Sequence, residues 1–294
     1  MSTMTIASAV PLAAEQLMPA DARAMAVLIQ GSGPIDRNGD AARLALGIQR
    51  QLAEGLSERG VASIRWDKRG VGESGGDFLS TGLHDLVDDA LAVVDEAMRT
   101  GLPVVVIGHS EGTAIAARLL VERPDIAGAV LLSPYARNGL EVLRWQARGL
   151  QNDVPALVRG ILRIMRTDLE TQTEKNRQRL LATTRDVERI GGAKINARWF
   201  REFMAYDPVV DLSRATQPVF AIAAELDLQS PPEDAAAIAE LRTAPTRHLL
   251  LDGLSHILRR QPTATLRTYR RDARLPIDER IVPLIAAWVE QLTE

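Results

Sequence analysis

Short apolar runs alternate with segments of helical periodicity along most of the chain. Six runs have the length of strands: 24–30, 61–67, 102–108, 126–134, 218–227 and 247–253. Apolar positions recur at helical spacing over 41–59, 83–99, 113–122, 232–242 and 277–293. Nearly continuous apolar strands are typical of a sheet that is buried on both faces. The pattern predicts an α/β fold with a mostly parallel central sheet flanked by helices.

The alternation stops in the second half of the chain. Residues 136–205 contain no strand-like run, and 154–169 carries an apolar helical face between arginines. We therefore expect an inserted helical cap over 136–205, with the core formed by 1–135 and 206–294. The polar, arginine-rich stretch 259–276 predicts a surface loop.

Composition narrows the function classes. The chain has 294 residues, 46% apolar and 25% charged, so it can bury a sizeable core. A net charge of -3 gives no reason to expect nucleic acid as a partner. The absence of cysteine excludes disulfides, thiolate metal sites and a cysteine nucleophile. The four histidines show no metal-ligand spacing, so we expect no metal or other cofactor.

The N-terminal segment lacks the features of a signal peptide. Its first basic residue is Arg23, and Pro11 and Glu15 limit its apolar stretch. No window approaches the roughly 18 apolar residues of a membrane span. These features predict a cytoplasmic protein without a membrane span, and they indicate nothing about its oligomeric state.

A serine stands between two glycines where a strand pattern changes into a helix pattern. Residues 104–115 read VVVIGHSEGTAI, with Ser110 flanked by Gly108 and Gly112. A sharp strand-to-helix turn of this kind lifts a nucleophilic serine clear of the sheet, and glycines at these two positions relieve the crowding. The alternative is an ordinary tight turn whose serine caps the helix. The context favours a nucleophile.

A base and an acid must come from elsewhere in the chain. His109 is adjacent to the serine and should point away from it, His248 lies in a strand, and His84 lies near a helix start upstream. His256 follows the last strand in a loop, which makes it the favoured base. The acid should end the strand before it; Asp227 comes last at the exit of that strand and is preferred to Glu225.

An ester hydrolase also needs amide donors for the developing oxyanion. One is expected from the residue after the nucleophile, the N–H of Glu111. The loop GSGP (31–34) follows the first predicted strand, and Ser32, then Gly33, are the candidates for the second donor. If the serine turn were absent from the sequence, the default interpretation would be that these glycines serve only the turn of their own loop.

The order Ser110, Asp227, His256 with GHSEG on a turn resembles the α/β-hydrolase family. QGSGPIDRNG (30–39) and RWDKRGVGESGG (65–76) are similar to loops of a bacterial esterase subgroup that carries HGSGP followed by DR[DN]G. Gln30 departs from the usual histidine of that motif. The resemblance implies the α/β-hydrolase fold and a cofactor-free serine hydrolase that acts on small carboxylic esters, often with short acyl chains.

Weaker hypotheses concern residues outside the predicted catalytic groups and oxyanion donors. Trp199, Phe203 and Tyr206 cluster at the end of the predicted cap, as core or as lining of the acyl pocket. Asp67, Lys68 and Arg69 predict an internal ion-pair and turn network rather than catalytic groups. Two alternatives to an esterase stay open: a peptidase, thioesterase or carbon–carbon hydrolase on the same three residues, and a non-catalytic ligand receptor.

Overall fold

The computed structural model describes residues 1–150 and 169–293, and its framework is a single large sheet. The strands across the sheet are, in order, β1 (Ser2–Ala7), β2 (Pro11–Leu17), β6 (Val61–Trp66), β3 (Ala24–Ile29), β7 (Val104–His109), β8 (Gly128–Leu132), β11 (Val219–Ala224) and β12 (Thr246–Leu251). The strands from β6 to β12 run parallel, and β1 and β2 add an antiparallel hairpin at one edge. The predicted α/β fold is confirmed.

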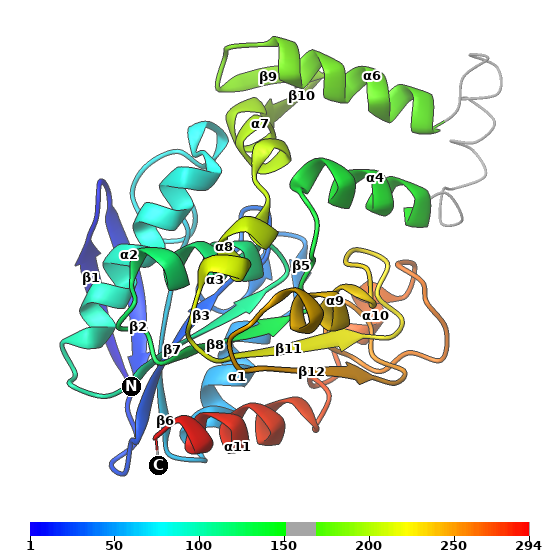
Figure 1. The fold of residues 1–294 in the computed structure, drawn as a ribbon. Coiled ribbons are helices and arrows are strands. Elements are labelled where there is room, and N and C mark those ends of the chain that lie inside the picture. The colour runs from blue at the N-terminus through cyan, green and yellow to red at the C-terminus, as the bar shows by residue number, and fades with distance from the viewer. Residues whose placement is uncertain (151–168, 294) are drawn as a thin grey trace.

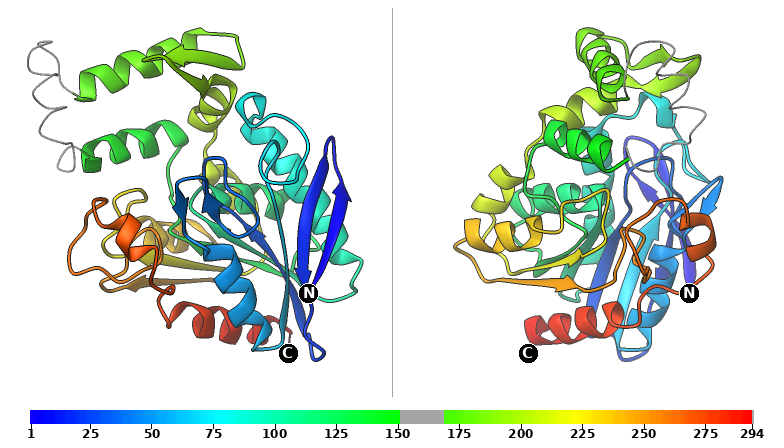
Figure 2. Two further views of the ribbon diagram at one scale, coloured as in Figure 1. Left: turned by 180° about the vertical axis from the view of Figure 1, so that it is seen from behind. Right: turned by 90° about the vertical axis from the view of Figure 1, so that its right-hand side faces the viewer.

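Helices cover both faces of the sheet. One face packs against α2 (Leu83–Met98), α3 (Glu111–Glu122), α8 (Pro208–Arg214) and α9 (Asp234–Leu241), and the other against α1 (Ile48–Ser57) and α11 (Ile281–Thr293). Figure 1 looks onto the first face, and the left view of Figure 2 shows α1 and α11 on the second. This two-sided cover explains why the central strands read as unbroken apolar runs.

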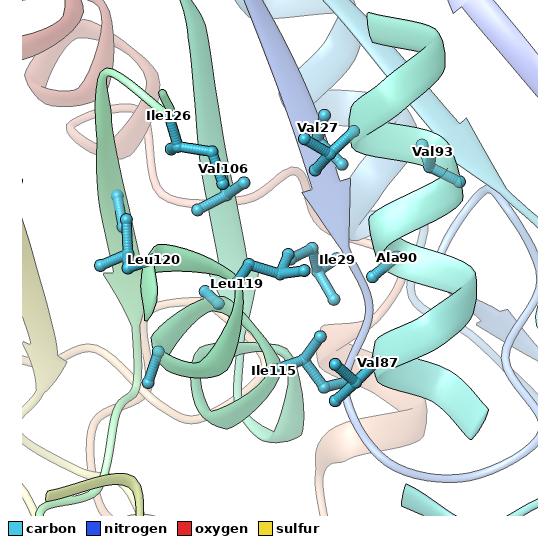
Figure 3. Close-up of a cluster of buried hydrophobic side chains, with 14 of the residues drawn as sticks. Val27, Ile29, Val87, Ala90, Val93, Val106, Ile115, Leu119, Leu120 and Ile126 are labelled. Carbon is cyan, nitrogen blue, oxygen red and sulfur yellow. The ribbon is translucent and has the colours of Figure 1, made fainter. Parts of the chain in front are cut away.

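Alternate residues of β3 show how the two cores are divided. Val27 and Ile29 pack with α2 and α3, whereas Ala26 and Leu28 pack with α1 and α11. Side chains alternate across a strand, so every residue of a central strand must be apolar to satisfy both layers. Figure 3 shows the first layer, with Ile29 of β3 facing Ala90 of α2 and Val87 of α2 beside Ile115 of α3.

Part of the predicted cap segment, 136–205, lies beyond one end of the parallel strands (Figure 1). It contains α4 (Gly139–Leu150), α6 (Leu169–Ala182), β9 (Val187–Ile190), β10 (Ala193–Asn196) and α7 (Ala197–Ala205). A small apolar cluster of its own includes Leu180, Ala197 and Met204. The helix predicted over 154–169 falls almost wholly outside the described residues.

The expectation that 136–205 lacks strands was wrong. β9 and β10 pair antiparallel, and two glycines connect them, Gly191 at φ 57° and Gly192 at φ 84°. Two residues with positive φ make the tight turn that matches the twist of a hairpin. The glycine pair was a usable signal, but the four-residue strands are too short and too polar to give a clear alternation.

Three further expectations needed correction. The helix predicted over 41–59 starts only at Ile48, because residues 40–45 form a short hairpin of β4 (Asp40–Ala41) and β5 (Leu44–Ala45). The open end of this hairpin is held by the Asp40 carboxylate, which accepts a hydrogen bond of 2.6 Å from Gly47 N. The hairpin of β1 and β2 was not foreseen. The stretch 259–276 is not all surface, since Arg259 is buried and donates to three backbone carbonyls.

Among the described residues, no helix combines the length and the apolar character needed to cross a bilayer.

Candidate active site

Ser110 occupies the sharp turn between β7 and α3. Its backbone lies at φ 54° and ψ −119°, a region that residues other than glycine rarely adopt. Ser110 N donates to Leu132 O at 3.0 Å, and Ser110 O accepts from the amide and hydroxyl of Thr113 at 2.8 and 2.7 Å. These bonds to the neighbouring strand and to the helix hold the strained turn in place.

The two flanking glycines are required by contact with backbone atoms. A Cβ added at Gly108 would overlap the carbonyl of Gly112 and stand 2.7 Å from Thr113 N. A Cβ added at Gly112 would overlap the carbonyl of Ile29 and stand 2.9 Å from Gln30 O. Neither neighbour is a side chain that could rotate away. The spacing G-x-S-x-G therefore reflects how closely strand and helix approach at Ser110.

Asp227 and His256 form a buried pair at the ends of adjacent strands. Asp227 follows β11 and His256 follows β12, which lie parallel, so both loops emerge at the same edge of the sheet. His256 Nδ1 lies 2.8 Å from Asp227 Oδ2 and 3.0 Å from Oδ1. A neutral imidazole that donates from Nδ1 to this carboxylate keeps its lone pair on Nε2.

The position of the Asp227 carboxylate is held by its own loop. Its Oδ1 accepts from Gln229 N at 2.7 Å and from Ser230 N at 2.8 Å. Gln229 O in turn accepts from Gln146 of α4, so a helix of the 136–205 segment contacts the acid loop. Glu225, the rejected alternative, is exposed and accepts from Gly253 N at 2.8 Å, away from the imidazole.

Ser110 and His256 line one cavity of about 200 Å³. Ser32, Gly33 and His109 also line it. No hydrogen bond joins Ser110 Oγ to the imidazole within the described part of the chain. Such bonds are often long in free enzymes and tighten when substrate binds. The structure thus brings the predicted nucleophile, base and acid to one edge of the sheet.

The remaining histidines have other roles. His109 Nε2 lies 2.8 Å from His256 O, and the two rings are 5.0 Å apart between centroids. Burial, with a smaller contribution from His256, lowers the pKa of His109 to about 3, so it stays neutral and braces the loop of the base. His84 and His248 are exposed, on α2 and β12, and neither lines this cavity.

The loop after β3 forms part of the cavity lining. Ser32 and Gly33 line it, and neither Ser32 N nor Glu111 N donates to any described residue. Gln30, which replaces the usual histidine of the HGSGP motif, is fully buried and donates to Trp66 O. It therefore ties the end of β3 to the end of β6.

The aromatic residues expected near the acyl pocket lie elsewhere. Trp199 of α7 donates to the Glu111 carboxylate and stacks on Phe203, with centroids 4.8 Å apart and rings 11° from parallel. The Tyr206 hydroxyl donates to Asp211 at 2.8 Å. None of the three is among the described residues that line the cavity at Ser110. They brace the base of the 136–205 segment against the nucleophile turn.

Sequence reasoning missed the wall that the β4–β5 hairpin contributes. Ala41, Leu44 and Leu46 line the cavity, together with Ile35 and Ile257. These residues were assigned to a helix or left unassigned, although Gly39 and Gly47, which flank the hairpin, were an available signal. These residues give the cavity an apolar part of its lining.

The 67–69 segment forms the internal ion-pair network that its charges predict. Arg37 reaches the Asp67 carboxylate through its amide at 2.7 Å and its Nη2 at 2.6 Å, and these bonds help lower the pKa of Asp67. Lys68 pairs with Glu111 at 2.7 Å, and Arg69 with Asp89. Each pair joins this loop to a different element. Among the described residues, no cluster of histidine, aspartate or glutamate side chains could hold a metal ion.

Comparisons with known proteins identify the family of the chain. A family model described as "Serine aminopeptidase, S33" matches residues 45–262, most of the chain. Esterase EstD of Thermotoga maritima is 27% identical over 269 residues, covering 90% of this chain and 61% of EstD, so the chain spans about three fifths of that relative. Monoglyceride lipase of Homo sapiens is 38% identical over 92 residues, 30% of either chain.

Solved structures match along nearly the whole chain. Est1E from Butyrivibrio proteoclasticus, solved with ferulic acid bound, has a TM-score of 0.63 at 19% identity, covering 98% of this chain and 96% of that one. The Pyrococcus furiosus esterase Pf2001 has a TM-score of 0.61 at 15% identity, covering 100% and 93%. At such identities the likeness establishes the fold, which is that of the α/β-hydrolases.

Proposed function

Since the chain belongs to the S33 serine aminopeptidase family of α/β-hydrolases, we propose that it is a serine hydrolase that cleaves carboxylic esters through an acyl-enzyme on Ser110. One observation carries the proposal. Ser110, in its strained turn, and His256 line the same cavity, and Asp227 is hydrogen-bonded to His256 on its buried side, while Ser32 N and Glu111 N have no partner among the described residues. This is the set of groups that acyl transfer requires.

In the proposed reaction, Ser110 Oγ attacks the carbonyl carbon of the ester while His256 Nε2 takes the hydroxyl proton. The carbonyl π electrons move to the oxygen, and the oxyanion accepts hydrogen bonds from Glu111 N–H and from Ser32 N–H, with Gly33 N–H next to it. The tetrahedral intermediate collapses, and the imidazolium protonates the departing alcohol. A water molecule, deprotonated by His256, then attacks the acyl-enzyme and releases the acid and free Ser110.

The cavity favours an ester with a small acyl group. Its volume of about 200 Å³ is below the common range of ligand pockets, and Leu44, Leu46 and Ile257 make one side apolar. Short to medium acyl chains fit such a space. The relatives named esterase and monoglyceride lipase support an ester as the substrate, without indicating its acyl length.

An aminopeptidase activity is the second candidate, because the family description names it. An aminopeptidase must bind the free ammonium of its substrate, which calls for a carboxylate in the cavity. Among the described residues lining the cavity at Ser110 there is no aspartate or glutamate. This favours the ester over the peptide.

The test compares the wild type with Ser110→Ala. We expect the wild type to hydrolyse p-nitrophenyl acetate and butyrate faster than longer esters, and Ser110→Ala to lose roughly 10⁴- to 10⁶-fold in kcat. A fluorophosphonate probe should label the wild type only. Equal rates for the two proteins would refute the proposal. Faster cleavage of amino-acid p-nitroanilides than of esters would favour the aminopeptidase, and a wild-type protein that the fluorophosphonate probe leaves unmodified at Ser110 would favour a receptor.

A further inference from the structure

A buried ion pair lies directly behind the proposed oxyanion site. Lys68 follows β6 and Glu111 is the first residue of α3; their side chains are 2% and 1% exposed, and Nζ lies 2.7 Å from Oε2. Burying two opposite charges is costly, and an apolar pair of similar size is often at least as stable. Stability alone therefore gives little reason for this pair.

Lys68 also holds the peptide group that carries one of the two proposed oxyanion donors. Its Nζ donates to Gly31 O at 2.6 Å. Gly31 O and Ser32 N–H belong to the same planar trans peptide, so they point in opposite directions. When the ammonium fixes Gly31 O on the buried side, Ser32 N–H is directed to the other side. Ser32 lines the cavity at Ser110.

Glu111 connects the same ammonium to the second donor and to the 136–205 segment. Its own N–H is the other proposed oxyanion donor, while its Oε2 accepts from Lys68. Its second carboxylate oxygen accepts from Trp199 Nε1 of α7. The carboxylate thus has a charged partner on the oxyanion loop and an indole partner on α7.

We propose that Lys68 and Glu111 are positioning residues that hold the two oxyanion donors, Ser32 N–H and Glu111 N–H, at a fixed separation, and that Trp199 links this arrangement to α7. The inference rests on the proposed function. The ion pair should stabilise the transition state, because the oxyanion exists only there. It should have little effect on binding of the uncharged ester. The loss of one oxyanion donor lowers kcat by about 10²- to 10³-fold in hydrolases.

The network offers a matched control. Arg69, the next residue along the chain from Lys68, pairs with Asp89 of α2, with Nη2 2.9 Å from Oδ1 and side chains 10% and 0% exposed. This pair is also buried and joins the same loop to a helix. Within the described part of the chain, neither side chain forms a hydrogen bond or ion pair with Gly31, Ser32 or Glu111.

The experiment compares Lys68→Met/Glu111→Leu with the control Arg69→Met/Asp89→Leu. Both double variants replace a buried ion pair with apolar residues, so neither leaves an unpaired charge. Measurements are the melting temperature, kcat and KM on p-nitrophenyl butyrate, and the inhibition constant of a trifluoromethyl ketone, whose adduct with serine carries an oxyanion. Fluorophosphonate labelling of the wild type first establishes that Ser110 is a working nucleophile. Absence of labelling would refute the proposed function, and with it the oxyanion site that Lys68 and Glu111 are proposed to position.

We expect the Lys68→Met/Glu111→Leu variant to lose about 100-fold in kcat with KM within about threefold of the wild type. The ketone should bind more weakly by a similar factor, and the control should keep wild-type values for all three constants. A folded Lys68→Met/Glu111→Leu variant with wild-type kcat and ketone affinity would overturn the inference. A purely structural role would lower the melting temperature without this split between kcat and KM.

Glu111→Gln keeps the test decisive if the double variant does not fold. The amide has one accepting oxygen, so it cannot accept from both Lys68 and Trp199 as the carboxylate does. We expect at least a fivefold lower kcat with KM unchanged, and about threefold for Trp199→Phe, which removes only the indole donor. Wild-type kcat in Glu111→Gln would contradict the proposed positioning.

Discussion

The glycine after the nucleophile provides the sharpest test of how the turn at Ser110 is built. In Gly112→Ala, the added methyl group overlaps Ile29 O and lies 2.9 Å from Gln30 O, where an ordinary contact begins near 3.4 Å. Relieving the second contact alone requires α3 and the end of β3 to separate by about 0.5 Å, and the first requires more. Both obstacles are backbone atoms of a central strand, so they cannot move independently of the sheet.

The expected cost follows from this shift. Overpacking in a rigid core destabilises by about 1–3 kcal/mol, and alanine returns about 1 kcal/mol of helix propensity. Because the added methyl overlaps a backbone carbonyl, the cost lies in the upper part of that range, about 2–3 kcal/mol, and we expect Gly112→Ala to lower the free energy of unfolding by about 1–2 kcal/mol. The activity should fall further, by about 10²-fold, because the moving segment carries Ser110 and the Glu111 amide.

Gly55→Ala is the matched control for that substitution. Gly55 is also a helical glycine, in α1, and its added Cβ would meet the side chain of Val282 at 3.0 Å rather than backbone. Urea unfolding and hydrolysis of p-nitrophenyl butyrate measure both effects. We expect Gly55→Ala to stay within about 1 kcal/mol of the wild type and to keep its activity. Wild-type stability and rate in Gly112→Ala would refute the steric explanation of the motif.

Two further predictions concern the acid and the buried histidine. Asp227→Asn keeps the shape but removes the charge that orients His256, so kcat should fall by about 10⁴-fold, whereas Glu225→Gln should keep its activity; similar losses in both would contradict the assignment. His109 has a pKa of about 3 in the folded state, against an ordinary value of 6.5. Between these two pH values the unfolded state binds more protons than the folded state. The free energy of unfolding therefore falls as the pH drops below 6.5, by at most about 1.4 kcal/mol per pH unit. Urea unfolding at pH 7 and pH 5.5 should show a smaller loss in His109→Gln than in the wild type; equal losses would exclude His109 as the source.

Local patterns determined most of the fold and the position of the strained turn at Ser110. The apolar runs at β3, β7, β8 and β11 were recognisable because a strand covered on both faces carries few polar positions. The turn at Ser110 was recognisable because its two glycines lie two residues either side of the serine, and the crowding they relieve arises within a single strand–turn–helix unit. Such features depend on neighbours along the chain.

Short polar elements were missed for the opposite reason. The hairpins of β4 with β5 and of β9 with β10 have strands of two and four residues, too short for alternation to show. Their glycines were visible, but a glycine also ends a helix, and the adjacent periodicity near Leu44 favoured the helix. The pairing between the strands selects the hairpin over the helix.

Only the tertiary structure decided how distant residues are paired. In the sequence, Asp227 is preferred to Glu225 because it stands at the exit of the predicted strand. Its contact with His256, however, depends on β11 and β12 being adjacent in the sheet. The pair of Lys68 and Glu111 is separated by 43 residues and has no periodic or motif signature. Which charges meet in the interior is set by the packing of whole elements, since Coulomb attraction and desolvation depend on distances in space and not on spacing along the chain.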